Sequence, residues 1–141
     1  MEATIRVGQA ADAFAIAALM EQLGYPVAAA QIKERLARLA EHRVVFVAAA
    51  DCAIVGWASV CADETLVDGL EACIEGFVVD ERSRSRGIGL RLLHSAEQWA
   101  REHGCANLVV RSNVVRTRAH AFYERNGFAT IKAQCFFRKR L

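Results

Sequence analysis

Apolar residues near the N-terminus recur at the three- to four-residue spacing of amphipathic helices. In residues 11–23 this spacing predicts a first helix, with Asp12 as a candidate N-cap and Gly24 as a stop. Pro26 then interrupts the pattern, because proline cannot continue a helix. The spacing resumes in residues 28–41, where charged side chains separate the apolar positions. The first part of the chain is therefore predicted to contain two helices.

The middle of the chain is rich in residues that favour strands. Residues 43–50 and 53–61 are dense in valine, alanine and other apolar side chains, and the two residues between them predict the turn of a hairpin. Residues 70–80 alternate into an apolar stretch and predict a longer strand.

The second half of the chain alternates helices and short strands. An apolar stripe predicts a helix over residues 87–103, followed by a strand over 107–111, a helix over 117–125 and a last strand or hairpin over 128–137. The expected order is βααβββαβαβ. No linker, repeat or low-complexity segment interrupts it, so residues 1–141 are expected to form a single domain.

Composition narrows the class of protein. With 141 residues, 54% of them hydrophobic, the chain is long enough for one domain with a sizeable core. A formal net charge of +2 gives no reason to expect a nucleic-acid partner, and no apolar run approaches the roughly 20 residues that span a membrane. The N-terminus lacks the pattern of a leader peptide, so a cytoplasmic protein without a membrane partner is expected.

The cysteines give no sign of a metal site. There are five of them, scattered along the chain, without a Cys-x-x-Cys pair or a histidine at metal-ligand spacing. We expect reduced thiols at Cys52, Cys61, Cys73, Cys105 and Cys135, with neither a structural metal nor a disulfide framework.

An arginine- and glycine-rich segment follows the longer strand. Arg82, Arg84 and Arg86 alternate with other residues, and Gly87 and Gly89 open the next helix. Glycines let the N–H groups of a first helical turn approach an anion, and the helix dipole strengthens the attraction. The segment therefore predicts a pyrophosphate site, although it is neither a Walker loop nor a dinucleotide fingerprint. A basic, solvated turn is the alternative.

Two motifs resemble those of the GNAT superfamily of N-acyltransferases. Arg84-x-x-Gly87-x-Gly89 resembles the acetyl-CoA signature of that family, in which glutamine or arginine precedes two glycine or small positions. Residues 112–128 resemble its second motif, in which a strand end with asparagine leads to a helix reading Ala-His-x-Phe-Tyr-Glu and closing at Gly-Phe. The two motifs occur in the family's order, and the resemblance covers essentially the full chain.

The resemblance implies an α+β fold with three layers. Its mixed central sheet has six to seven strands flanked by four helices, and its fourth and fifth strands splay apart at their ends. Acetyl-CoA would be the co-substrate, with its pantetheine arm in the gap between these two strands. No metal is implied.

The resemblance also assigns cofactor-binding residues. Backbone groups of Phe77, Val78 and Val79 would pair with the pantetheine arm, and an N–H near Val79 would stabilise the oxyanion formed from the thioester. Asn113 would hydrogen-bond the arm or a water, although asparagine at a strand end is also an ordinary turn former, and Arg116 would reach a phosphate. The pyrophosphate would lie on Arg84, Ser85, Arg86, Gly87, Ile88, Gly89 and Leu90.

Tyr123 is the predicted general acid, because the family places this tyrosine near the sulfur of CoA. A phenol pKa of about 10 and a thiol pKa of about 8.5 are close enough for the proton transfer. The alternative is a tyrosine that only packs beside Phe122.

The group that receives the proton of the amine is left open. Many relatives carry a glutamate where this chain has Cys73, and a small residue where it has Glu75. Glu71, Cys73 and Glu75 share one face of the strand, so Glu75 is displaced from the usual position by about 7 Å. Glu75 is predicted to bind the amine or to relay its proton, and a surface or structural role is the alternative.

These observations predict an acetyl-CoA-dependent N-acetyltransferase in which a primary amine attacks the thioester directly. The acceptor is expected to be a small-molecule amine. A protein lysine or N-terminal acetyltransferase and a non-catalytic acyl-CoA sensor are the alternatives. A homodimer is left open, because the apolar segment around residues 135–137 offers an exposed strand edge.

Overall fold

The computed structural model of the chain describes residues 2–141, which form two compact units. The first unit runs as far as Val110 and the second is Arg111–Leu141. None of the described helices is long and apolar enough to cross a membrane.

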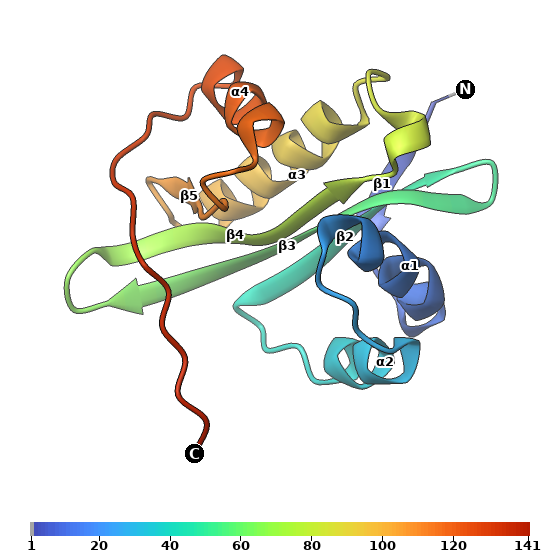
Figure 1. Cartoon of the computed structure of the whole chain (residues 1–141), viewed down its shortest axis with the longest axis horizontal. Coiled ribbons are helices and arrows are strands. Elements are labelled where there is room, and N and C mark those ends of the chain that lie inside the picture. Colours follow the sequence, from blue (N-terminus) through green and yellow to red (C-terminus); the bar gives the residue numbers. More distant parts are fainter. Residues whose placement is uncertain (1) are drawn as a thin grey trace. The chain divides into compact units, whose positions relative to one another are not determined.

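The first unit contains most of the regular structure (Figure 1). A short 3-10 helix, Ala10–Asp12, precedes α1, and another, Glu81–Ser83, precedes α3. The predicted elements of this unit are present, although the second helix is shorter than expected and the second strand of the hairpin is longer. The elements are β1 (Thr4–Val7), α1 (Ala13–Leu23), α2 (Ala29–Ala37), β2 (Arg43–Ala50), β3 (Ala53–Thr65), β4 (Gly69–Val79), α3 (Ile88–Glu102) and β5 (Leu108–Val110).

The strands form one mixed sheet in the order β1-β2-β3-β4-β5. The first four strands pair antiparallel, and β5 pairs parallel to β4. Asp51 and Cys52 form the predicted hairpin turn, with positive φ angles of 46° and 62°. The mixed α+β class is confirmed. The expected count of six to seven strands is wrong, because the described residues contain five.

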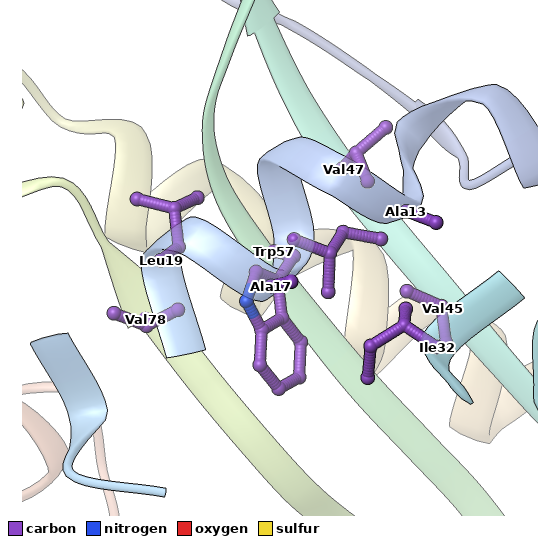
Figure 2. Close-up of a cluster of buried hydrophobic side chains, with 9 residues drawn as sticks. Ala13, Ala17, Leu19, Ile32, Val45, Val47, Trp57 and Val78 are labelled. Carbon is purple, nitrogen blue, oxygen red and sulfur yellow. The ribbon is translucent and has the colours of Figure 1, made fainter. Parts of the chain in front are cut away.

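Apolar side chains cover both faces of the sheet. Helices α1 and α2 lie on one face, where Ile16 and Ile32 join Val45, Trp57 and others in a buried cluster (Figures 1 and 2). Helix α3 covers the other face, where its residues pack on alternate positions of the same strands. The sheet is therefore buried on both sides, which explains why its strands read as almost continuous apolar runs.

Gly24 ends α1 as predicted, in the left-handed conformation with a φ of 91°. Asp12 stands at the expected N-cap position of α1, but its carboxylate makes no cap hydrogen bond to that helix. It accepts instead from the backbone N–H of Gln9 and from the guanidinium of Arg6. These bonds hold the pKa of the buried Asp12 carboxyl below its usual range, with the Arg6 hydrogen bond as the largest cause.

A β-bulge interrupts the pairing of β3 with β4. Ser59 pairs with Gly76 and Val60 with Ile74, so Glu75 has no partner across the ladder. Beside the bulge, the ring of Trp57 fills the space where Gly76 lacks a side chain: a Cβ placed on Gly76 would lie 2.5 Å from the Cη2 atom of Trp57. The glycine and the indole are therefore matched in shape.

The second unit contains α4 (Thr117–Arg125), as predicted. The helix ends at Asn126 and at Gly127, whose φ is 93°. The chain then turns back, and the N–H of Phe128 donates to the carbonyl of Tyr123 at 3.0 Å. The ring of Tyr123 packs edge-on against those of Phe122 and Phe128, with centroid separations of 5.5 and 5.4 Å.

The strand predicted over residues 128–137 is wrong for the described chain. Residues 128–141 have no strand, and the large side chains of Ile131, Phe136, Phe137 and Leu141 are exposed. An apolar, β-favouring sequence forms a strand only where a neighbouring strand satisfies its backbone N–H and C=O groups. The sequence pattern indicates the tendency to pair and does not identify the partner.

We expect Gly76→Ala to destabilise the protein by about 1–3 kcal/mol, because the added methyl group would overlap the ring of Trp57. Gly8→Ala is the matched control, since a Cβ at Gly8 meets its nearest neighbour at 3.4 Å. Urea unfolding of the two variants measures the difference. Equal free energies of unfolding for the two variants would show that the close packing of Gly76 on Trp57 carries no cost.

Candidate active site

The edge of β4 that faces β5 is open over the second half of the strand. The two strands pair only at Ala72 with Leu108, Cys73 with Val109 and Ile74 with Val110. Strand β5 ends there, whereas β4 continues to Val79. Among residues 2–141, no strand pairs with this last part of β4 on that side. The first unit thus shows the predicted parting of the fourth and fifth strands.

The bulge at Glu75 decides which backbone groups face the open edge. Near the start of β4, the N–H of Ala72 points towards β5, where it donates to the Asn107 carbonyl at 3.1 Å. After its end, the N–H of Asp80 points the other way and donates to the Val55 carbonyl at 2.8 Å. Successive N–H groups of a strand alternate between its two sides.

Counting back from Asp80, the N–H groups of Phe77 and Val79 point to the open edge, whereas that of Val78 points to β3. At the start of β4, the N–H groups of the even-numbered residues point to β5. Without the bulge, they would do so along the whole strand. Phe77 and Val79 therefore offer backbone donors and acceptors of the kind that an extended amide chain can pair with. This is the geometry expected for the backbone contacts to pantetheine.

Asp80 organises the loop that leaves β4. Its buried carboxylate accepts from the backbone N–H of Arg82 at 3.0 Å and from its guanidinium at 3.1 Å. The Arg82 hydrogen bonds hold the pKa of Asp80 below its usual range, so this pair stays ionic at neutral pH. Of the three alternating arginines, Arg82 is thus engaged within the loop. Arg84 and Arg86 make no ion pair with residues 2–141.

The N-terminus of α3 has the backbone form predicted for an anion site. Ser85 and Gly87 both have positive φ angles, of 68° and 75°. The first backbone bond of the helix is the N–H of Arg91 to the Gly87 carbonyl, at 3.1 Å. The N–H groups of residues 88–90 therefore have no acceptor within the helix, and together with the helix dipole they can hold phosphate oxygens.

A cavity of about 380 Å³ lies between the sheet and helices α1 and α2. Glu75 lines it and is paired with Arg43, the first residue of β2. Register places Arg43 opposite Cys61, and Cys61 opposite Cys73, in one row across three strands. The thiol of Cys61 also hydrogen-bonds the Glu75 carboxylate.

These partners keep Glu75 ionised. Partial burial raises the pKa of its carboxyl, but the hydrogen bonds from Arg43 and Cys61 outweigh that effect and leave the pKa below its usual value. Burial and the neighbouring carboxylate raise the pKa of Cys61 to about 12, so its thiol remains a hydrogen-bond donor at neutral pH. A carboxylate with a lowered pKa is a weak base and a good ligand for an ammonium group.

The second unit gathers the other predicted site residues around the start of α4. The side-chain oxygen of Asn113 accepts from the N–H of Val115 at 3.1 Å, and its carbonyl accepts from the N–H of Arg116 at 3.0 Å. Asn113 thus acts as a turn former, whatever else it binds. Tyr123 is buried, which raises its pKa, while the charge of Arg116 has a smaller opposing effect. Its phenol is therefore protonated at neutral pH.

Sequence reasoning missed Arg43 and Cys61 as partners of Glu75. The available signal was an arginine at the start of an otherwise apolar strand. Placing it beside Glu75 requires the register of three strands together with the bulge, and neither follows from apolar periodicity.

Comparison with known proteins agrees with this geometry. The model of the acetyltransferase (GNAT) family matches residues 12–128. The chain belongs to this family. An aminoglycoside N(6')-acetyltransferase type 1 of Stenotrophomonas maltophilia is 34% identical over 144 residues, covering 98% of this chain and 94% of that protein. A protein of the same name from Serratia marcescens is 31% identical and covers 79% of each chain.

Solved structures show the same fold. The aminoglycoside N-acetyltransferase AAC(6')-Iy in complex with CoA is 25% identical, with a TM-score of 0.82 and coverage of 98% of this chain and 100% of that one. The same enzyme with a bisubstrate analogue, CoA-S-monomethyl-acetylneamine, is 26% identical, with a TM-score of 0.84 and full coverage of both chains. The predicted family, the acyltransferase class and acetyl-CoA as co-substrate are confirmed.

We expect Gly89→Glu to abolish acetyl-CoA binding, because it sets a carboxylate at the second residue of α3, where phosphate oxygens would lie. His94→Glu adds the same charge farther along the helix, at an exposed position, and is expected to keep near-normal affinity. Calorimetric titration with acetyl-CoA compares them. Equal affinities would remove the start of α3 from the binding site.

Proposed function

We propose that this acetyltransferase transfers the acetyl group of acetyl-CoA to a primary amine of a small molecule, by direct attack of the amine on the thioester. The observation that carries the proposal is that three features needed for the reaction lie along β4 and the loop that follows it. Glu75 lines a cavity, the backbone of Phe77 and Val79 faces an open edge, and the chain then runs directly into the anion site at the start of α3. One segment thus provides for the acceptor, the thioester arm and the phosphates.

In this mechanism Glu75 binds the acceptor as its ammonium ion. Because the carboxylate is ionised and accessible, it can orient the amine and stabilise the positive charge that grows on nitrogen during attack. Before attack the ammonium ion loses a proton to water, which frees the lone pair of nitrogen, since the lowered pKa makes Glu75 a weak base. Of the two N–H groups at the open edge, that of Phe77 is nearer Glu75, where the thioester would lie, and it is the proposed donor to the oxyanion in place of Val79.

Tyr123 is the proposed acid for the departing thiolate. Its pKa is raised by burial, so the phenol carries a proton to give at neutral pH. The packing of its ring between Phe122 and Phe128 fixes the side chain on α4. We also propose contacts from Asn113 and Arg116 to the cofactor, from the start of the same helix.

A small-molecule acceptor is supported by the curated relatives, which are named as aminoglycoside acetyltransferases. A solved ribosomal-protein-alanine N-acetyltransferase of Brucella melitensis is 18% identical and shares the fold alone. Release of free thiol from acetyl-CoA with a panel of aminoglycosides, polyamines and amino acids tests the proposal. Binding of acetyl-CoA without thiol release for any amine would favour a sensor, and release only with peptides would favour a protein acetyltransferase.

We further propose that residues 1–141 form one catalytic domain in the cytoplasm. The family model spans both compact units, which supports a single domain. All five cysteines are free, as is usual for proteins of a reducing compartment where acetyl-CoA is available.

We expect Tyr123→Phe to lower kcat by roughly 100-fold while acetyl-CoA affinity stays the same, because the phenylalanine keeps the packing and loses the proton. Tyr25→Phe removes the hydroxyl of an exposed tyrosine and is the control. Steady-state thiol release, measured with the acceptor found in the panel, gives kcat for both. An unchanged kcat for Tyr123→Phe would assign the residue to packing alone.

A homodimer is proposed from the exposed apolar tail, because β-favouring segments without a partner strand commonly pair with another chain. Sedimentation equilibrium should then give twice the mass of one chain. Phe137→Asp should shift the protein to monomer, whereas Thr130→Asp, an equal charge at another exposed position of the tail, should not. A monomeric mass for the unaltered protein would overturn the dimer.

A further inference from the structure

The cavity that contains Glu75 has an apolar side and a polar side. Helices α1 and α2 contribute Ile16, Met20, Ile32 and Leu36 to a mostly apolar wall, to which α2 adds one charged residue, Arg35. The other polar lining residues come from the strands. A ligand that fills the cavity therefore needs an apolar body and polar groups gathered at one end.

The polar groups are mostly hydrogen-bond donors. Arg35 and Arg43 line the cavity together with Ser59, and Glu75 is the single acidic residue among the lining residues of the described chain. Trp57 contributes an aromatic ring to the lining (Figure 2). The polar part of the cavity therefore favours a ligand that brings a hydrogen-bond acceptor or an acid group.

The charge balance of the cavity disfavours a simple cation. Two arginines and one carboxylate line the space, and Arg43 already pairs with Glu75. Consider an amine without an acid group that binds Glu75. Its ammonium group either displaces Arg43, which then loses its ion-pair partner, or lies next to Arg43, where the two positive charges repel. An amine that also carries an acid group avoids both costs, because two ion pairs replace one: ammonium with Glu75 and acid with Arg43.

We propose that the acceptor is a primary amine that carries a carboxylate or a similar small acid group on an apolar body, as in an apolar amino acid or its derivative. Arg43 is the residue that determines this specificity. This inference rests on the proposed function and specifies its substrate class. It separates this chain from enzymes that act on polycationic acceptors, whose binding would place several positive charges beside Arg35 and Arg43.

The test compares matched amines that differ by one carboxylate: phenylalanine with phenethylamine, and leucine with isoamylamine, with kanamycin as a polycation. Thiol release should show kcat/KM at least ten-fold higher for an amino acid than for its decarboxylated partner. Arg43→Gln should remove this preference, because it should raise KM for the amino acid by at least ten-fold more than KM for its decarboxylated partner. Arg38→Gln, an exposed arginine of the same region outside the cavity lining, is the control.

The outcomes separate the inference from the function on which it rests. Turnover of kanamycin or of the simple amines at rates equal to or above those of the amino acids would overturn the inference and leave the proposed function standing. An equal loss for both members of a pair in Arg43→Gln would show that Arg43 only positions Glu75, and would also overturn it. No thiol release with any amine, despite acetyl-CoA binding, would overturn both.

Discussion

The bulge at Glu75 is the constraint on which the rest of the site depends. One extra residue in β4 reverses the alternation of the strand at its midpoint. It places Glu75 and Gly76 together at the cavity, and it turns the N–H groups of Phe77 and Val79 towards the open edge. The fit of Trp57 against Gly76 secures this arrangement from the face covered by α1 and α2, since a larger residue at position 76 would push the ring away.

The open edge and the anion site follow from the same strand. Because β5 ends at Val110, no strand among residues 2–141 pairs with the last residues of β4 on that side. The chain leaves the sheet at Asp80, whose carboxylate holds Arg82 by hydrogen bonds. The loop that contains Arg84, Arg86 and Gly87 then leads to the start of α3. Backbone groups therefore make most of the proposed cofactor site, so the site depends little on the identity of side chains.

Much of the fold was predictable, because apolar periodicity and glycine stops are local signals. Helices α1, α3 and α4 and the β2–β3 hairpin lie where the pattern put them, and the glycines indicated where α3 begins. The bulge was not predictable, since it is a property of the pairing of two strands. The partners of Glu75 were missed for the same reason. The expected last strand failed because pairing needs a neighbour that local sequence does not reveal.

The most direct test of the account is an experimental structure of the protein with bound CoA. The account predicts the pyrophosphate on the N–H groups of residues 88–90 and the pantetheine arm along β4, paired with the backbone of Phe77 and Val79. It also predicts that the thiol end of CoA lies towards Glu75. CoA bound elsewhere, or a β4 edge closed by another strand in the complex, would contradict it.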